Sequence, residues 1–244
     1  MPNTDRTANW SLVVPLKPLS LAKSRLSPTA SDAVRPGLAL AFAQDTVAAA
    51  LACCAVRDVA VVTSDALAAA ELAALGARIV PDTAAAGLNP ALAHGARAVR
   101  ELRPGAAVAA LNADLPALRP AELRRVLDRA AEFPRAFLTD AAGIGTTLLT
   151  ARPDTELSPA FGGLSRARHS ASGAVEILLE GVASVRQDVD TGDDLLAAAA
   201  LGLGPHTARR YAAVTGGRGP GGWSAGRPEH GDDPRSPAGP TPCP

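Results

Sequence analysis

The chain has 244 residues, 47% of them hydrophobic, so it is long enough to bury a full core as one domain or as two small ones. Its 24 lysines and arginines balance its 24 aspartates and glutamates, which excludes a global field that would draw the chain to nucleic acid or to an anionic membrane. Its 3 cysteines, two of them adjacent at positions 53 and 54, suit neither a disulfide framework nor a metal cluster.

The first residues, MPNTDRTANW, contain no basic start followed by an apolar stretch, and charges interrupt the later apolar runs before they reach the length of a bilayer span. The sequence therefore predicts a cytoplasmic protein without a membrane partner. Residues 1–9 are expected to form a flexible N-terminus.

Short apolar stretches rich in valine and leucine are typical of buried strands. They cover residues 10–16, 58–64, 77–82, 106–114 and 136–140. Helical patterns lie between them, at residues 37–54, 65–75, 90–102 and 120–132. This alternation of strand and helix predicts an α/β domain whose parallel sheet is covered on both faces.

The second half of the chain has a different pattern. GIGTTLLTA begins at residue 143 and is followed by a loop-rich stretch, a predicted helix near 174–180, the segment SVRQDVDT and a helix from residue 193. We expect this half to elaborate the substrate-facing side of one domain that extends over residues 10–207. Fifteen of the thirty residues from 215 to 244 are glycine or proline, so the tail, residues 208–244, is expected to be disordered.

Three aspartates are candidate metal ligands. Asp114 ends the predicted strand 106–114, and in such sheets ligands bind outside the carboxyl ends of the strands. Asp188 and Asp190 are two residues apart, so on an extended segment they face the same side. Together the carboxylates predict a Mg²⁺ site, since this ion prefers hard oxygen ligands and completes its shell with phosphate oxygens. The alternative for Asp114 is a capping or turn residue. For the other two, it is that Asp190 or Thr191 caps the helix that begins near residue 193, which could account for one of the two aspartates.

The loop after the first predicted strand is basic. Its sequence, VVPLKPLSLAKSRLSP, carries Lys17, Lys23 and Arg25 and no acidic residue. In a nucleotide-binding sheet such a loop surrounds a triphosphate with ammonium and guanidinium groups, and a solvated surface loop is the alternative. The Walker motif is absent, and no G-x-G-x-x-G lies between a predicted strand and a predicted helix, which disfavours a P-loop nucleoside triphosphatase and a dinucleotide dehydrogenase.

Two glycine-containing segments, GIGTTLL and FGGLSRARH, combine small residues with hydroxyl groups and arginines. This combination predicts a cradle for a small phosphorylated acid, with simple surface turns as the alternative. His169, in the second segment, is assigned a structural or anion-binding role, because a phosphate nucleophile is already ionised at neutral pH and needs no general base.

Taken together, these segments resemble the guanylyltransferases of coenzyme F420 biosynthesis, the CofC or FbiD family, which act on 2-phospho-L-lactate or phosphoenolpyruvate. The segments that match, in chain order, are PLKPLSLAKSRLSP, LNPAL, NADLPAL, GIGTTLL, FGGLSRARHSASGA and DVDTGDDL. The resemblance implies a single-domain nucleotidyltransferase fold, GT-A-like and Rossmann-like, which is a three-layer sandwich with a mostly parallel mixed sheet.

The resemblance also implies roles for individual residues. The metal site would consist of Asp114, Asp188 and Asp190, and Asn89 would lie near the nucleoside. The acid substrate would be held by Thr146, Gly162 and Ser165. The nucleotide would be bound by Lys17, Lys23 and Arg25, which would also act catalytically by stabilising charge on the departing pyrophosphate.

The implied ligands are GTP, Mg²⁺ and a phosphorylated three-carbon acid, which is phosphoenolpyruvate, 2-phospho-L-lactate or 3-phosphoglycerate, and a downstream transferase of the same pathway is a candidate partner. Two other functions stay open. One is a nucleotidyltransferase of the same fold that uses CTP or UTP with a sugar phosphate or polyol phosphate. The other is a non-catalytic nucleotide-binding protein, which the three acids disfavour because converging carboxylates are costly without a cation. The oligomeric state is not predicted.

Overall fold

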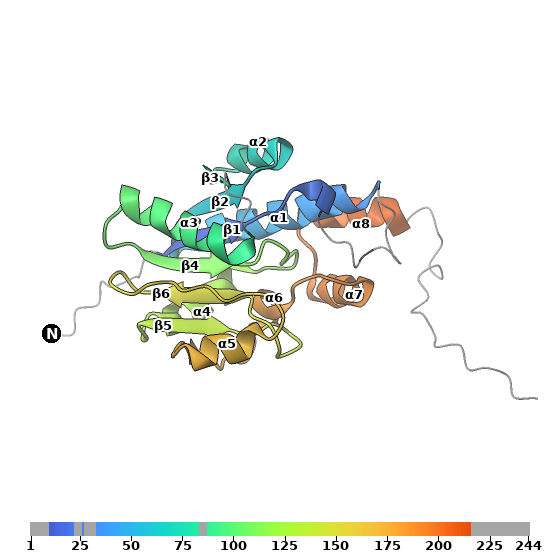
Figure 1. The fold of residues 1–244 in the computed structure, drawn as a ribbon. Coiled ribbons are helices and arrows are strands. Elements are labelled where there is room, and N and C mark those ends of the chain that lie inside the picture. Colours follow the sequence, from blue (N-terminus) through green and yellow to red (C-terminus); the bar gives the residue numbers. More distant parts are fainter. Residues whose placement is uncertain (1–9, 22–25, 27–32, 83–86, 216–244) are drawn as a thin grey trace, which may run out of the picture.

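The computed structural model describes residues 10–21, 26, 33–82 and 87–215, and Figure 1 shows their arrangement. The strands form one mixed sheet with the order β3-β2-β1-β4-β6-β5-β7. They are β1 (Trp10–Pro15), β2 (Val56–Thr63), β3 (Arg78–Pro81), β4 (Ala107–Leu111), β5 (Arg135–Leu138), β6 (Leu148–Ala151) and β7 (Val175–Glu176). Strands β1 to β4 pair in parallel, β6 is antiparallel to β4 and β5, and β7 is parallel to β5. The prediction of a mostly parallel mixed sheet is confirmed.

Helices connect the strands in the predicted alternation. They are α1 (Arg35–Leu51), α2 (Ala66–Ala74), α3 (Leu88–Leu102), α4 (Pro120–Ala130), α5 (Ser165–Ala171), α6 (Ala183–Arg186), α7 (Gly192–Leu201) and α8 (Pro205–Thr215), with a 3₁₀ turn η1 (Leu19–Leu21). The five strands and four helices predicted in the first half are observed, with ends that differ by a few residues. Across the described ranges, none of the helices has the length and apolar character needed to cross a bilayer.

The sheet is the middle of three layers. In β1, Leu12 and Val14 join the apolar cluster that contains residues of α1, α2 and α4, whereas Val13 joins the cluster that contains residues of α3. This alternation places one apolar layer on each face of the sheet. Figure 1 shows α3 and α5 on the near face of the sheet and α4 behind it. The predicted three-layer sandwich is therefore confirmed.

The second half contains two corrections. The helix predicted near 174–180 is wrong, because residues 175 and 176 form the edge strand β7 and the Ile177 N–H continues its pairing by donating to the Phe137 carbonyl at 2.8 Å. Ile177 is buried while Leu178 is 76% exposed, which is a strand-like alternation. Conversely, residues 165–171, which were expected in a loop, form the helix α5.

The C-terminal helix α8 packs on α1, as Figure 1 shows. The carboxylate of Asp45, in α1, accepts hydrogen bonds from the backbone N–H groups of His206 at 3.0 Å and Thr207 at 2.7 Å. This contact caps the first turn of α8 and joins it to the domain. The folded domain therefore continues to Thr215, and the boundary predicted after residue 207 is too early. Residues 1–9 and 216–244 lie outside the described residues.

Candidate functional site

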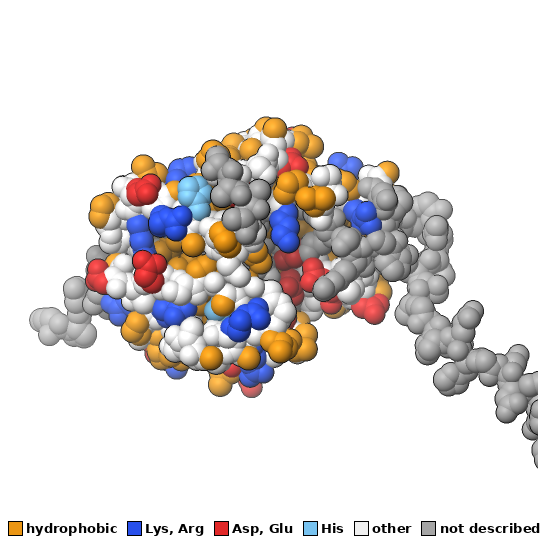
Figure 2. Space-filling model, in the orientation of Figure 1, with side chains coloured by type: hydrophobic (Ala, Val, Ile, Leu, Met, Phe, Trp, Pro, Cys, Tyr) orange, Lys and Arg blue, Asp and Glu red, His pale blue; other side chains and the backbone are white. Residues whose placement is uncertain are grey.

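A cavity of about 740 Å³ lies beyond the carboxyl ends of β1 and β4, in the size range of small-molecule sites. Seven separate parts of the chain line it, and it contains seven of the predicted site residues. These are Lys17, Asp114, Thr146, Gly162, Ser165, Asp188 and Asp190. Figure 2 shows acidic side chains gathered near the middle of the visible face with a basic side chain beside them.

A second cavity, of about 310 Å³, lies between α3 and residues 156–159. Its charged residues have both signs, and its Arg100 donates to the carbonyl oxygens of Arg152 at 3.0 Å and Thr155 at 2.8 Å. None of the predicted site residues that the structure describes lines this cavity. We therefore assign the function to the larger cavity.

Asp114 follows β4 in a turn that α1 holds in place. The hydroxyl of Thr46, in α1, is fully buried, accepts a hydrogen bond from the Leu115 N–H at 3.0 Å and lies 3.2 Å from the Ala113 carbonyl. The Asp114 carbonyl accepts the N–H of Val189 at 3.1 Å, which ties this turn to the second acidic segment. The backbone around Asp114 is thus fixed on both sides.

Asp188 and Asp190 both line the cavity, while Val189 between them is fully buried in the apolar cluster formed with α1 and α7. This alternation agrees with the prediction that Asp188 and Asp190 face the same side of the chain. Asn112, which sequence reasoning missed, also lines the cavity and donates to Asp188 Oδ2 at 3.3 Å. The cap of α7 is formed by Thr191, so the capping alternative for Asp190 is not needed.

The three aspartates line the same cavity, but they do not form a complete metal-coordination site by themselves. Among the residues that the structure describes, no three histidine, cysteine, aspartate or glutamate side chains are grouped closely enough to hold a metal ion. The hard oxygen donors nevertheless fit Mg²⁺, which proteins commonly hold through one or two carboxylates together with substrate phosphate oxygens. The residues therefore fit a metal site that the bound nucleotide completes.

The loop after β1 brings Lys17 to the cavity. Its path is set by Asp65, the N-cap of α2, whose carboxylate accepts the N–H of Ala68 at 3.0 Å and of Leu19 at 2.9 Å. These donors lower the pKa of Asp65. Lys17 is exposed, so its ammonium group is accessible to an anionic ligand. Lys23 and Arg25 lie outside the described residues, and their predicted roles stay predictions.

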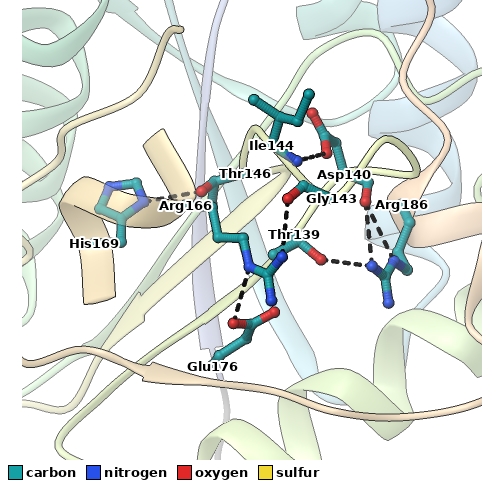
Figure 3. Close-up of polar contacts among 9 residues, drawn as sticks. All are labelled: Thr139, Asp140, Gly143, Ile144, Thr146, Arg166, His169, Glu176 and Arg186. Atoms are coloured by element: carbon teal, nitrogen blue, oxygen red, sulfur yellow. Dashed lines mark hydrogen bonds and ion pairs between the residues drawn. The ribbon is translucent and has the colours of Figure 1, made fainter. Parts of the chain in front are cut away.

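The loop that follows β5, residues 139–146, forms another wall of the cavity. The Asp140 carboxylate closes this loop by accepting the N–H of Ile144 at 2.9 Å and of Gly145 at 2.8 Å. From the flanks, Arg166 donates to the Gly143 carbonyl at 3.0 Å and Arg186 donates to the Asp140 carbonyl. Figure 3 shows Asp140 and Gly143 between these two arginines. Sequence reasoning missed Asp140, although it ends a predicted strand as Asp114 does.

The loop before α5, residues 160–164, also forms a wall of the cavity. Side chains that do not line the cavity hold its backbone through hydrogen bonds. Asn89 accepts the N–H of Phe161 at 2.7 Å and donates to the Phe161 carbonyl at 3.2 Å. Arg168 donates to the carbonyl oxygens of Ala160 and Gly162. Neither Asn89 nor Arg168 is among the described residues that line the cavity. We therefore infer that Asn89 and Arg168 hold this loop in place. The predicted position of Asn89 near the nucleoside stays a prediction.

His169 is fully buried behind the cavity wall, in contact with the rings of Phe137 and Phe161. Its Nδ1 lies 2.9 Å from Thr146 Oγ1, and its Nε2 accepts the N–H of Ala160 at 3.0 Å, so it joins two walls of the site. Burial, together with the charges of Arg135 and Arg168, lowers its pKa from 6.5 to about 4. The expected structural role is consistent with this position.

This burial predicts a pH dependence of stability. Between pH 6.5 and about 4 the unfolded chain binds a proton at His169 that the folded chain does not bind. The contribution of His169 to the free energy of unfolding should therefore be constant above this window and fall by up to about 3 kcal/mol as the pH drops through it. Urea unfolding at a series of pH values tests this, with His169→Asn as the comparison. An equal pH slope for both proteins in this window would contradict the assignment.

A family model described as "Guanylyl transferase CofC like" matches residues 10–211. A protein of Streptomyces coelicolor named phosphoenolpyruvate guanylyltransferase is 72% identical over 199 residues, which are 82% of this chain and 94% of that protein. Proteins of the same name from Streptomyces avermitilis and Thermomonospora curvata are 74% and 60% identical, over 82% and 84% of this chain and 92% and 89% of those proteins.

Solved structures show the same fold at low identity. A nucleotidyl transferase from Methanothermobacter thermautotroptrophicus superposes with a TM-score of 0.53 at 20% identity, covering 78% of this chain and 95% of that one. A 4-diphosphocytidyl-2C-methyl-D-erythritol synthase superposes with a TM-score of 0.50 at 13% identity, covering 80% of this chain and 99% of that one. These likenesses confirm a nucleotidyltransferase-type fold.

Proposed function

Because the chain belongs to the CofC-like guanylyl transferase family, we propose that it transfers GMP from GTP to the phosphate of phosphoenolpyruvate, or of 2-phospho-L-lactate, in coenzyme F420 biosynthesis. The observation that carries this proposal is the meeting of seven predicted site residues, from separate segments, in one cavity. The two hydroxyl groups, the ammonium group and the three carboxylates match the needs of an acid, a triphosphate and a divalent cation.

In the proposed reaction, a phosphate oxygen of the acid attacks the α-phosphorus of GTP in line. The new phosphorus–oxygen bond forms as the bond to the bridging oxygen of pyrophosphate breaks, and pyrophosphate leaves. Two unit charges about 4 Å apart repel by about 4 kcal/mol at an effective dielectric constant of about 20, so the encounter of two anions needs cationic groups. Lys17 would stabilise the charge that grows on pyrophosphate.

Mg²⁺ would be held by carboxylates among Asp114, Asp188 and Asp190 and by phosphate oxygens of GTP. When bound, the ion supplies charge neutralisation at the phosphates and a template for in-line geometry. The chain's own contribution is to hold these carboxylates on backbone segments that Thr46 and Val189 fix to the rest of the domain. Without a cation, three carboxylates on one wall would repel the triphosphate.

The acid would occupy the end of the cavity that contains Thr146, Gly162 and Ser165. Thr146 and Ser165 are 4% and 1% exposed, so each hydroxyl is held by packing around it and loses little freedom on binding. Gly162 has φ 91°, a conformation that favours glycine and sets the path of the loop at this wall. The product would pass to a downstream transferase of the same pathway.

Substrate selection is tested with each of the four nucleoside triphosphates, Mg²⁺ and a mixture of phosphoenolpyruvate, 2-phospho-L-lactate and 3-phosphoglycerate. We expect pyrophosphate release with GTP, and mass spectrometry should show guanylylated phosphoenolpyruvate as the main product. Preference for CTP or UTP would replace the proposal with the related nucleotidyltransferase. Nucleotide binding without turnover for any acid would indicate a non-catalytic protein.

Gly145 gives a test of the acid end of the cavity. A Cβ at this position would lie 2.3 Å from Asp140 Oδ2, so Gly145→Ala should break the Asp140 bonds that close the loop and displace the adjacent Thr146. We expect a KM for phosphoenolpyruvate about tenfold higher, the cost of one hydrogen bond to a charged group. The matched control is Gly37→Ala, in α1, where the nearest atom would be an ordinary 3.5 Å away. Equal KM values in both variants would contradict this role of the loop.

A further inference from the structure

His169 has two polar contacts, and they differ in kind. At Nε2 the partner is the backbone N–H of Ala160, which can only donate, so Nε2 must present its lone pair. At Nδ1 the partner is the Thr146 hydroxyl, which can donate or accept. A neutral imidazole carries one proton, and since Nε2 is an acceptor, the proton is on Nδ1. The Nδ1–H therefore donates to Thr146 Oγ1.

The protonated ring does not fit these contacts. An imidazolium would place an Nε2–H against the Ala160 N–H, with two donors facing each other and no acceptor between them. The ring is also fully buried between Phe137 and Phe161, with Arg135 and Arg168 as the cationic groups that disfavour a further positive charge. His169 is thus fixed as a neutral group with one defined tautomer.

The consequence falls on Thr146. Because the Thr146 oxygen accepts a hydrogen bond from His169 Nδ1–H, the O–H of Thr146 is left to donate. Within the described part of the chain, no other hydrogen bond of this hydroxyl is found. Thr146 lines the cavity, whereas His169 is not among the described residues that do so. We propose that His169 is a positioning residue that makes the Thr146 hydroxyl an obligate hydrogen-bond donor to an anionic oxygen of the acid substrate. This inference rests on the proposed function.

The expected effect is on the affinity for the acid. A hydroxyl that is already oriented as a donor needs no rearrangement when an anionic oxygen arrives, whereas an unpinned hydroxyl rotates among donor and acceptor positions. Hydrogen bonds to charged groups are among the stronger ones, so we expect a change of about tenfold in KM or Kd for phosphoenolpyruvate. The effect on kcat should be smaller, because His169 touches no reacting atom.

Two substitutions separate this role from simple support of the loop. In His169→Asn, the side-chain N–H₂ can take the place of Nδ1–H and still donate to Thr146, while the bond to Ala160 is lost. In His169→Gln, the side-chain oxygen can take the place of Nε2 and accept from Ala160, while donation to Thr146 is lost. We expect His169→Gln to raise the KM for phosphoenolpyruvate about tenfold, and His169→Asn to raise it by no more than about threefold. The reverse order would overturn the proposal and assign His169 to loop support.

A double-mutant cycle with Thr146→Val isolates the effect that His169 exerts through the Thr146 hydroxyl. Thr146→Val should raise the KM by about as much as His169→Gln, and adding His169→Gln to it should have no further effect, since the hydroxyl is already gone. Independent, multiplicative effects of the two substitutions would overturn the proposal. Long-range ¹H–¹⁵N correlation spectra of the wild-type protein should show His169 as the neutral Nδ1–H tautomer. An Nε2–H or doubly protonated ring would overturn it, even if His169→Gln failed to fold.

Calorimetric titration of phosphoenolpyruvate into the protein, with Mg²⁺ and an α,β-methylene GTP analogue present, separates this proposal from the proposed function. If phosphoenolpyruvate binds, with the predicted order of Kd among the variants, but GTP gives no product, only the proposed function fails. If turnover is normal and the Kd values of wild type and His169→Gln are equal, only the role of His169 fails. Absence of binding to the wild-type protein would overturn both.

Discussion

Asp114→Asn should lower kcat for guanylyl transfer by about a hundredfold or more, while the fold is retained. Asp114 lines the cavity directly after β4, where the rigid sheet meets the loops. The substitution keeps the size of the side chain and removes the charge that would hold Mg²⁺ at the α-phosphate. The backbone bonds of this turn with Thr46 and Val189 do not involve the carboxylate, so they should persist.

Steady-state rates of pyrophosphate release at saturating Mg²⁺ measure this effect, with Asp190→Asn and Asp188→Asn as companions. Asp193→Asn is the matched control, because it makes the same change in charge in the neighbouring segment, where Asp193 is exposed and is not one of the described residues lining the cavity. Near-normal kcat for Asp114→Asn would refute its role as a metal ligand. A loss in Asp193→Asn of similar size would show that the effect is not specific to the cavity.

The second large effect is expected for Lys17→Met, which should lower kcat by about a hundredfold with a smaller change in the KM for GTP. The physical reason is that an ammonium group that meets the leaving pyrophosphate contributes most when charge develops there, in the transition state. Met retains most of the apolar stem and removes only the charged end. Lys17→Arg should recover part of the rate, since a guanidinium group also binds phosphate oxygens.

Arg57→Met is the control for Lys17→Met, since Arg57 is an exposed cation at the start of β2 and is not among the described residues of the cavity. Its kcat should stay within about twofold of wild type, as expected for an exposed charge away from the site. A rise in the KM for GTP with unchanged kcat in Lys17→Met would assign Lys17 to uniform nucleotide binding and contradict a catalytic role.

The first half of the fold was predictable because its strands are mostly apolar and its helices are long enough to show a helical period. In the second half, the helix predicted from residue 193 is observed as α7, but α5, β6 and β7 were not predicted. Helix α5 has seven residues, which is too short a window for a helical period to be recognised. Its formation depends on the burial of His169 by elements distant in the sequence. Strand β6 is buried at all four positions, so its sequence shows no alternation of apolar and polar residues. Its antiparallel pairing with β4 and β5 depends on the tertiary structure and has no local sequence signal. At 174–180, the free edge of β5 favours strand pairing over the predicted helix.

The site was predictable to the extent that its chemistry lies in local motifs. The spacing of Asp188 and Asp190 indicates one face of an extended segment, and the cavity contains both. The supporting contacts have no such local signal. Thr146 and His169 are 23 residues apart and Asn89 and Phe161 are 72 residues apart, so only the tertiary structure brings the partners together. The support that Asn89 gives to the loop around Phe161 was missed for this reason.

The most direct test of the central claim is a crystal structure with Mn²⁺, an α,β-methylene GTP analogue and phosphoenolpyruvate bound. Anomalous density for manganese should lie in the described cavity, with oxygens of at least one of Asp114, Asp188 and Asp190 and of the nucleotide phosphates as its ligands, and with phosphoenolpyruvate beside Thr146. Manganese or nucleotide bound elsewhere, or these carboxylates turned to bulk solvent beside an ordered triphosphate, would contradict the assignment of this cavity as the site of nucleotidyl transfer.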